Sequence, residues 1–311
     1  MPDADPDQAR SAFVTGATGV IGRLVVPELV KRGWQVTAVG RSPAKRAELA
    51  AMGAKGVELD MFDGRAVRRA LDGHDAVINL ATHMPSSILR TMLPWEWREN
   101  DYIRREGSAT LADAALDVGV MRFIQESFAP VYEDGGDRWI DERWPVRPTK
   151  YNRTVLDAEH SAARFTMAGR TGIVLRFASF YGPDSFLREM LKTARRGWMP
   201  IPGLPESYWS SVAHEDAAMA VVASLDVPAG VYNIVDDEPL TRREWADVMA
   251  TVLGVKRLKF MPLWLTNMLG GPLPLLSRSQ RMTNAAFKWA SKWEPRFPSA
   301  RVGLPEAVRA L

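Results

Sequence analysis

The stretch that decides the fold is FVTGATGVIG, residues Phe13 to Gly22. Apolar residues typical of a strand lead into it, and a helical pattern follows it. Its glycines, Gly16, Gly19 and Gly22, have the spacing Gly-x-x-Gly-x-x-Gly. In such a turn the first glycine permits a sharp bend, the second lets backbone N–H groups approach a pyrophosphate, and the third lets the helix lie close to the strand. Because the positive end of the helix dipole faces this turn, the stretch predicts a site for nucleotide phosphates.

The end of the second predicted strand, VTAVGRS, indicates which nucleotide is bound. An NAD-binding site needs an acidic residue about 20 residues beyond the glycines, where it binds the ribose 2′-hydroxyl. Gly40 stands at that place, and Arg41 follows it. Arginine can hold a 2′-phosphate with two hydrogen bonds, and Ser42 adds a hydroxyl. The sequence therefore predicts NADP(H) rather than NAD(H); the alternative is that Arg41 is a solvated surface residue.

Composition excludes several classes of protein. The chain has 311 residues, 46% of them hydrophobic and 25% charged, which is enough to bury a sizeable core. The net charge is +3 without any run of like charges, so we expect no nucleic-acid surface. The absence of cysteine excludes disulfides and thiol catalysis and fits a cytoplasmic location. Three prolines interrupt the apolar stretch at 260–276, which predicts a lid or subdomain segment; contact with a membrane surface is the minor alternative.

Strand and helix patterns alternate over the first 180 residues, which predicts a parallel sheet with helices on both faces. The predicted strands are 11–16, 35–40, 55–60, 75–81, 122–127, 171–180 and 230–236. The main predicted helices are 19–32, 43–52, 108–118, 151–168 and 212–225. The fold class is therefore α/β: a doubly wound parallel sheet, or Rossmann fold, with a small C-terminal substrate-binding cap. We expect a flexible tail over 1–10, an NADP-binding domain over 11–183 plus 208–236, and a cap over 184–207 plus 237–311.

Further motifs resemble the extended short-chain dehydrogenase/reductase (epimerase/dehydratase-like) family over nearly the whole chain. They are LDMFD (59–63), VINLAT (77–82), FIQESFAPVYE (123–133), KYNRTVLDAE (150–159), VLRFASFYGP (174–183) and GVYNIVDDEPLT (230–241). The cofactor-binding residues expected from the glycine turn, the second strand and this resemblance are Gly16, Thr18, Gly19, Val20, Ile21, Gly22, Arg41, Ser42, Asp60, Met61, Leu80, Ala81, Thr82, Tyr151, Phe177 and Ser179. The resemblance also implies a homodimer, paired through helices 108–118 and 151–168.

The resemblance breaks at the residues that carry the chemistry. The family's Tyr transfers a proton at the substrate oxygen, and a Lys four residues later favours the ionised Tyr and holds the nicotinamide ribose. Tyr151 is present, but the position four residues later is Val155. Lys150 would lie about 100° around the predicted helix, so we do not expect it to replace that Lys. Phe128 stands where a catalytic Ser or Thr is expected; the neighbouring Ser127 is a candidate if a bulge turns it to the same face.

Three further side chains are candidates for catalysis. Tyr151 is a usable acid but a poor base at neutral pH, which favours reduction over alcohol oxidation. Glu126 can act as an acid or base if it is buried, or it can form a salt bridge with Arg104 or Arg176. His83, just after a strand that faces the crevice, is the best placed of the four histidines for proton transfer. No two histidines have metal-ligand spacing, so we expect no metal site.

The function favoured by the sequence is an NADP(H)-dependent oxidoreductase that reduces a carbonyl or conjugated double bond of a small molecule. Several of the eleven tryptophans fall in the predicted cap, which favours a bulky hydrophobic or aromatic substrate; core packing is the alternative explanation. Two other functions stay open. One is an isomerase, epimerase or lyase that retains the cofactor, and the other is a non-catalytic NADP(H)-binding sensor.

Overall fold

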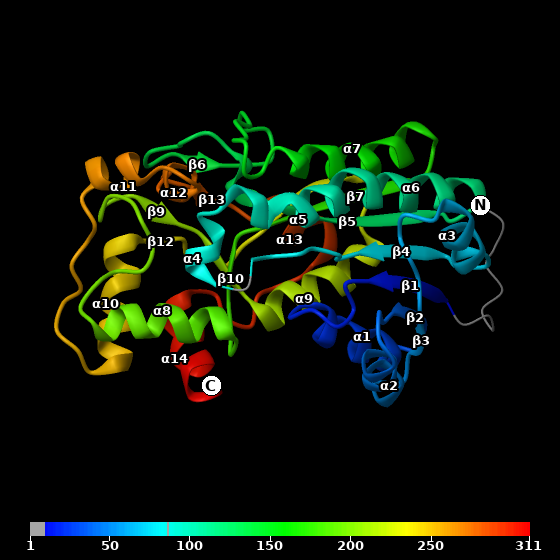
Figure 1. Cartoon of the computed structure of the whole chain (residues 1–311), viewed down its shortest axis with the longest axis horizontal. Helices are drawn as coiled ribbons and strands as arrows, with labels where there is room; N and C mark the ends of the chain where they lie inside the picture. Colours follow the sequence, from blue (N-terminus) through cyan, green and yellow to red (C-terminus); the bar gives the residue numbers. More distant parts are fainter. Residues whose placement is uncertain (1–9, 86) are drawn as a thin grey trace.

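A computed structural model describes residues 10–85 and 87–311, which are organised around a seven-stranded parallel sheet (Figure 1). The strand order is β11-β7-β5-β4-β1-β2-β3. The strands are β1 Ser11–Thr15, β2 Gln35–Val39, β3 Lys55–Val57, β4 Ala76–Asn79, β5 Arg122–Phe128, β7 Thr171–Phe177 and β11 Gly230–Ile234. The chain order reverses between β1 and β4, which opens a crevice at the carboxyl ends of the strands. Apart from Arg10, the predicted tail over 1–10 lies outside the described residues.

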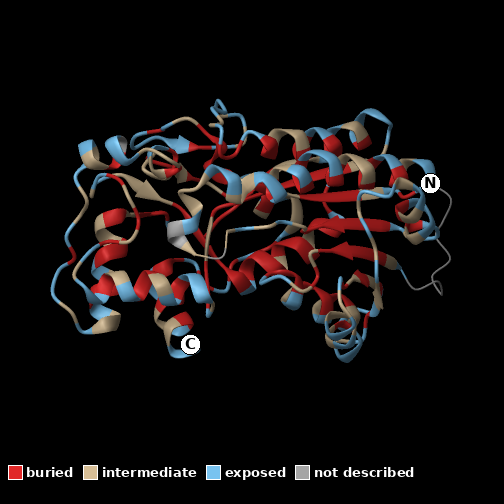
Figure 2. Cartoon of the chain, in the orientation of Figure 1, coloured by how far each residue is buried: buried red, intermediate tan, exposed pale blue. Residues whose placement is uncertain are grey.

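Helices cover both faces of this sheet, so its central strands are almost wholly buried (Figure 2). On one face α1, Gly22–Lys31, packs against α9, His214–Ala223. The other face is covered by α3 Gly64–Leu71, α6 Ser108–Asp117 and α7 Thr154–Met167. Helix α2, Pro43–Ala51, packs beside β3. Strands buried on both faces explain the continuous apolar runs in the sequence, and the predicted doubly wound fold is confirmed.

The C-terminal half adds a second apolar cluster beyond the carboxyl ends of the strands (Figure 1). Trp245 of α10, Leu191 of α8 and Leu304 of α14 are among its buried members. The helices of this part are α8 Ser185–Arg195, α10 Arg242–Leu253, α11 Leu263–Leu269, α12 Leu273–Leu276, α13 Ala285–Ser291 and α14 Ala300–Arg309. Its short strands are β6 Trp139–Ile140, β8 Ser179–Tyr181, β9 Tyr208–Trp209, β10 Ser211–Ala213, β12 Leu240–Thr241 and β13 Arg281–Met282. These strands pair as β8–β10, β9–β12 and β6–β13.

A run of short helices joins β4 to α6. It consists of α4 Ile88–Thr91, a 3-10 turn Pro94–Trp97, α5 Arg98–Tyr102 and a π-helical turn Ile103–Gly107. Two further 3-10 turns cover Ala129–Val131 and Ser224–Asp226. None of the described helices is long and apolar enough to cross a membrane.

Several predicted element bounds are wrong; the strand expected over 55–60, for example, ends at Val57. The helix expected over 19–32 begins at Gly22, because the Gly19 N–H is used in the turn, where it bonds the Gly16 carbonyl. The helix expected over 151–168 begins at Thr154, because the Asn152 side chain accepts the Thr149 N–H and holds residues 150–153 in a turn. The strand expected over 171–180 is two strands, β7 and β8, which belong to different sheets.

Candidate functional site

The glycine turn after β1 packs tightly against backbone on one side and is exposed to solvent on the other. Gly16 has φ +67°, and a Cβ there would lie 2.2 Å from the Leu80 carbonyl oxygen. A Cβ on Gly22 would lie 2.3 Å from the Gly16 carbonyl oxygen, so both positions require glycine. Gly19 and Val20 at the top of the turn are exposed. No side chain caps the N-terminus of α1, where the N–H groups of Arg23 and Leu24 donate to the carbonyls of Gly19 and Ile21.

A chain of buried polar groups runs from this turn along the carboxyl ends of three adjacent strands. Thr15 of β1 donates to Asn79 Oδ1 of β4 at 2.6 Å. The Asn79 side chain donates to Gln125 Oε1 of β5 at 2.9 Å, and Gln125 donates to the Glu126 carbonyl oxygen at 2.9 Å. Sequence reasoning missed Asn79 and Gln125, although a polar residue inside an apolar strand is a signal that could have found them.

The predicted 2′-phosphate residue Arg41 lies on the surface, with 78% of its side chain exposed. Its guanidinium is 3.5 Å from Glu99 of α5, and His83 Nδ1 is 3.2 Å from the same carboxylate oxygen. His83 is thereby placed beside Arg41 rather than beside Glu126, which pairs with Arg104. In the described part of the chain, no group of three or more His, Asp or Glu side chains is placed to hold a metal ion.

The other predicted cofactor residues differ in their exposure to solvent. Ser42 caps α2 by accepting the Lys45 N–H, and the exposed Asp60 accepts the Phe62 N–H. Leu80 is buried beneath the glycine turn, whereas Thr82 is exposed. The remaining members are Thr18, Ile21, Met61, Ala81, Phe177 and Ser179: Ile21 and Phe177 are buried and the others are partly exposed. The cofactor contacts of these residues stay predictions.

Tyr151 lies in the turn that precedes α7. Its side chain is buried, and its hydroxyl makes no hydrogen bond with any described residue. The ammonium of Lys150 lies 5.2 Å from the centre of the Tyr151 ring, so the expected 100° separation around a helix does not apply. Val155, at the position of the family's Lys, is fully buried inside α7. The phenol is therefore free to bind a ligand oxygen, without a lysine four residues later.

Two buried arginine–glutamate pairs lie near the end of β5. In the first, Arg104 Nη2 is 3.0 Å from Glu126 Oε1, while Arg104 Nε and Glu126 Oε2 have no hydrogen-bond partner among the described residues. We call this the unsaturated pair. The salt bridge between Glu126 and Arg104, weighed above as an alternative to acid–base work, is thus present.

The second pair, which we call the saturated pair, joins Arg176 of β7 to Glu159 of α7. Arg176 donates to both Glu159 oxygens at 2.8 and 2.6 Å and to the Tyr132 hydroxyl at 3.0 Å. Ser127 donates to Glu159 Oε1 at 2.5 Å, so its hydroxyl faces α7 and is buried. Burial lowers the pKa of Arg176, but the hydrogen bonds and charge of Glu159 outweigh this effect and raise it above its usual value.

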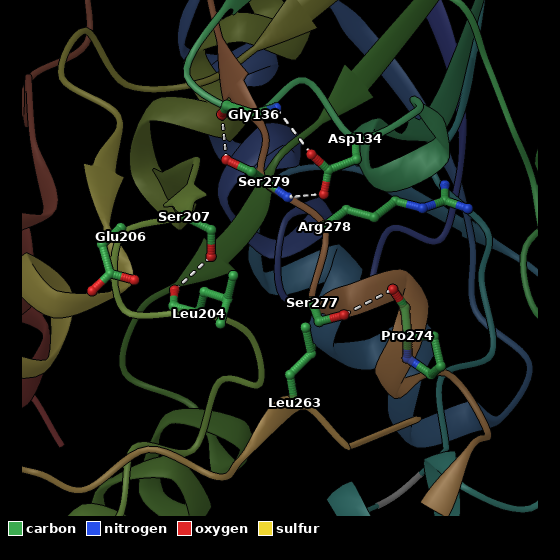
Figure 3. A pocket seen from close by; sticks show the side chains of 10 residues that line it. All are labelled: Asp134, Gly136, Leu204, Glu206, Ser207, Leu263, Pro274, Ser277, Arg278 and Ser279. Carbon is green, nitrogen blue, oxygen red and sulfur yellow. Dashed lines mark hydrogen bonds between the residues drawn. The ribbon is translucent and has the colours of Figure 1, made fainter. Parts of the chain in front are cut away.

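A cavity of about 370 Å³ lies between the segment around residues 134–136 and the C-terminal part of the chain (Figure 3). The residues that line it are Asp134, Gly136, Leu204, Glu206, Ser207, Leu263, Pro274, Ser277, Arg278 and Ser279. Both Asp134 oxygens accept backbone N–H groups, and Arg278 donates to the carbonyls of Tyr132 and Arg147. No tryptophan is among its described lining residues, so the predicted tryptophan-lined pocket is not found here.

The buried side chain of Arg242, at the start of α10, joins two segments near this cavity by hydrogen bonds. It donates to the carbonyls of Pro202, Tyr208, Leu276 and Arg278 and to the Ser207 hydroxyl. Burial lowers its pKa to about 10, which leaves it charged at neutral pH. Sequence reasoning did not single out this residue.

Comparison with known proteins agrees with this geometry. A family model described as NAD(P)H-binding matches residues 16–170, about half of the chain. A 3-diazoavenalumate denitrifying reductase from a Streptomyces species is 29% identical over 308 residues, covering 94% of this chain and 98% of the relative. A 4-hydroxy-2-methyl-3-oxo-4-farnesyl-3,4-dihydroquinoline-1-oxide ketoreductase from Stigmatella aurantiaca is 25% identical, covering 78% of this chain and 73% of the relative.

Two solved structures share the fold over the whole chain. The human epimerase family protein SDR39U1, determined with NADPH, has a TM-score of 0.79 and 22% identity, covering 97% of this chain and 100% of that chain. The UDP-glucose 4-epimerase of Thermotoga maritima, determined with UDP-glucose, has a TM-score of 0.78 and 22% identity, covering 96% and 98%. At this identity they show the fold alone. By the family match, residues 16–170 of this chain belong to the NAD(P)H-binding family.

Proposed function

We propose that this protein is an NADP(H)-dependent reductase of a carbonyl or conjugated double bond in a bulky, uncharged metabolite. Its class, a nicotinamide-dependent oxidoreductase, is supported by the family match and by relatives named as reductases. The observation that carries the proposal is Tyr151, a buried side chain whose hydroxyl has no hydrogen-bond partner among the described residues, in a chain that also has the glycine turn after β1. The glycine turn therefore fits a dinucleotide, and Tyr151 is a candidate proton donor.

Tyr151 is the proposed proton donor. A bound reduced nicotinamide supplies a hydride to the substrate carbon, and the Tyr151 phenol donates its proton to the substrate oxygen or stabilises the oxyanion. Because no other described residue competes for that hydroxyl by hydrogen bonding, it is available to the substrate. Glu126 and His83 remain secondary candidates, and Ser127 would have to leave Glu159 to take part.

The substrate proposal rests on the cavity shown in Figure 3. Its one guanidinium, that of Arg278, is committed to two carbonyls, and two carboxylates also line the wall. Such a wall does not favour the diphosphate of a sugar nucleotide, whereas Leu204, Leu263 and Pro274 offer apolar surface. The names of the relatives include 3-diazoavenalumate and a farnesyl-substituted dihydroquinoline oxide, and the farnesyl group supports a bulky apolar substrate.

Turnover with a panel of aromatic ketones, enones and diazo compounds tests the proposal, with NADPH consumption as the measurement. Tyr151→Phe should lower kcat by about 100-fold or more, the usual contribution of a positioned proton donor. Tyr232→Phe is the matched control, because its hydroxyl bonds the Pro228 carbonyl near the start of β11 and away from the crevice. Turnover that survives in Tyr151→Phe would exclude Tyr151 as the donor.

The cofactor preference has its own test. Arg41→Ala should weaken NADPH binding by roughly tenfold and leave NADH binding unchanged, because only NADPH presents a 2′-phosphate to the guanidinium. Tryptophan fluorescence quenching measures both affinities. Equal affinities of the unaltered protein for NADPH and NADH would refute the NADP preference.

A non-catalytic NADP(H) sensor is the second candidate, favoured by the buried Val155 at the lysine position and by the engagement of Ser127 with Glu159. A sensor would bind NADPH with high affinity but consume none with any substrate in the panel. Binding without turnover would therefore favour this candidate over the reductase.

A further inference from the structure

We propose that the unsaturated pair, Arg104 and Glu126, binds the carboxamide of the nicotinamide ring. This inference rests on the proposed cofactor and deepens it by naming residues for its reacting end. From the sequence, Glu126 was a candidate only as an acid or base or as a salt-bridge partner of Arg104 or Arg176, so a role of the pair in cofactor binding is new.

The first argument is the hydrogen bonding that the pair leaves unmade. Arg104 has 4% of its side chain exposed and Glu126 13%, yet a single contact of 3.0 Å joins them. One donor, Arg104 Nε, and one acceptor, Glu126 Oε2, are buried without a partner among the described residues. A buried polar atom without a hydrogen-bond partner destabilises the fold. Two such atoms in one ion pair indicate a partner that comes from outside the chain.

The saturated pair shows that this is no general property of buried ion pairs in the molecule. There Arg176 uses all three of its nitrogens, and both oxygens of Glu159 accept a hydrogen bond. Both pairs lie beside β5. The two pairs therefore differ in whether the chain itself supplies all of their hydrogen-bond partners.

The second argument is location. Glu126 is near the carboxyl end of β5, two strands from the glycine turn, and the buried polar chain through Asn79 and Gln125 connects the two. A dinucleotide in this fold lies across the strand ends on both sides of the reversal between β1 and β4. With Arg41 marking the adenosine half beyond β2, the nicotinamide half falls toward β4 and β5. Arg104 is held there by the π-helical turn Ile103–Gly107, a distortion frequent at functional sites.

The third argument is chemical complementarity. The pair offers one N–H donor and one carboxylate acceptor, and its net charge is zero. Glu126 would repel a phosphate or carboxylate, and Arg104 would repel a cation. A primary carboxamide is neutral and carries a carbonyl acceptor and an NH₂ donor on one carbon, so it matches both free atoms. The nicotinamide ring carries such a group.

The experiment compares NADP⁺ with its 3-acetylpyridine analogue, in which a methyl group replaces the carboxamide NH₂. Quenching of tryptophan fluorescence measures both affinities and needs no substrate. The unaltered protein should bind NADP⁺ at least roughly tenfold more tightly, because the analogue cannot donate to Glu126. In the double variant Arg104→Met/Glu126→Leu, which leaves no buried charge unpaired, this ratio should fall to about one.

The matched control is Arg176→Met/Glu159→Leu, which makes the same substitutions in the saturated pair and should keep the ratio. Circular dichroism checks that both double variants fold. If one does not, the pair of double variants is replaced by Glu126→Gln and its control Glu99→Gln. Glu126→Gln should lower the ratio of the two nucleotide affinities, and Glu99→Gln should leave it unchanged.

The outcomes separate this inference from the proposed function. An unaltered protein that binds both nucleotides equally well overturns the inference and leaves the cofactor proposal intact. If Arg104→Met/Glu126→Leu keeps the preference for NADP⁺ over the analogue, the inference is also overturned, because other residues then bind the carboxamide. If the unaltered protein binds neither nucleotide, the proposed function itself is refuted.

Discussion

The saturated and unsaturated pairs are chemically alike, each an arginine and a glutamate beside β5 that are buried or nearly so, yet their hydrogen bonding differs. Around Arg176 and Glu159 it supplies Ser127 and Tyr132 as further partners. Around Arg104 and Glu126 it supplies no further side-chain hydrogen bond among the described residues. The difference teaches that burial of a charge alone does not mark a binding site; incomplete hydrogen bonding does. Three predictions bear on this comparison.

The largest effect is expected from breaking the saturated pair. Arg176→Met leaves the Glu159 charge buried without its partner, which should lower the free energy of unfolding by about 3–5 kcal/mol. Arg164→Met on α7, the helix that carries Glu159, removes an exposed partner of Asp113. It should lower the free energy of unfolding by less than about 1 kcal/mol. Urea denaturation measures both. A loss for Arg176→Met no larger than that for Arg164→Met would remove the structural role assigned to this pair.

A smaller effect is expected from removing one hydrogen bond of the same pair. Ser127→Ala takes one donor from Glu159 Oε1, which still accepts from Arg176, so the free energy of unfolding should fall by about 1–2 kcal/mol. Urea denaturation and NADPH-dependent turnover are compared in the same preparation. If stability is kept while turnover falls about 100-fold, Ser127 belongs to the catalytic group and the saturated pair is not purely structural.

The smallest effect at neutral pH concerns Tyr132, which accepts from Arg176. Burial raises the pKa of Tyr132 to about 12, whereas tyrosine in the unfolded chain ionises near pH 10. The unfolded chain loses this proton first, so the stability that Tyr132 contributes is present below about pH 10 and is lost as the pH rises to about 12.

Urea midpoints measured between about pH 9 and pH 12 test this dependence. Tyr132→Phe should show a shallower decline than the unaltered protein, and Tyr102→Phe, at a half-exposed position, should show the same decline. An equally steep decline in Tyr132→Phe would assign the alkaline loss of stability to other groups.

Much of the fold could be predicted from the sequence, because strands buried on both faces leave continuous apolar runs and the glycine spacing allows few backbone solutions. The helix before Tyr151 was placed too early because the turn depends on one side chain, Asn152, bonding the backbone of Thr149. Helix periodicity carries no trace of such a bond. The position of Lys150 over the Tyr151 ring follows from that turn and could not be inferred without it.

The candidate site was predictable only where a residue's role is local. Gly16 is fixed by its φ of +67° and Gly22 by its contact with the Gly16 carbonyl, both within the turn, so their spacing was sufficient. Glu126 could be recognised as a partner of Arg104, but whether the pair is complete depends on distances across three elements. Arg176 in the middle of an apolar strand was a signal for a buried partner, yet the partner, Glu159, lies on a helix whose orientation the sequence does not state.

Arg242 has a consequence for how the cap can move. Because one guanidinium holds the segments around residues 202–208 and 276–278, these segments form a single mechanical unit whose parts cannot separate without exposing an unbound cation to apolar surroundings. Leu263 of α11 lines the same cavity but is outside that unit. Asp134, Gly136 and Pro274 also line the cavity outside that unit, so a change in its size would have to come from these residues or from α11.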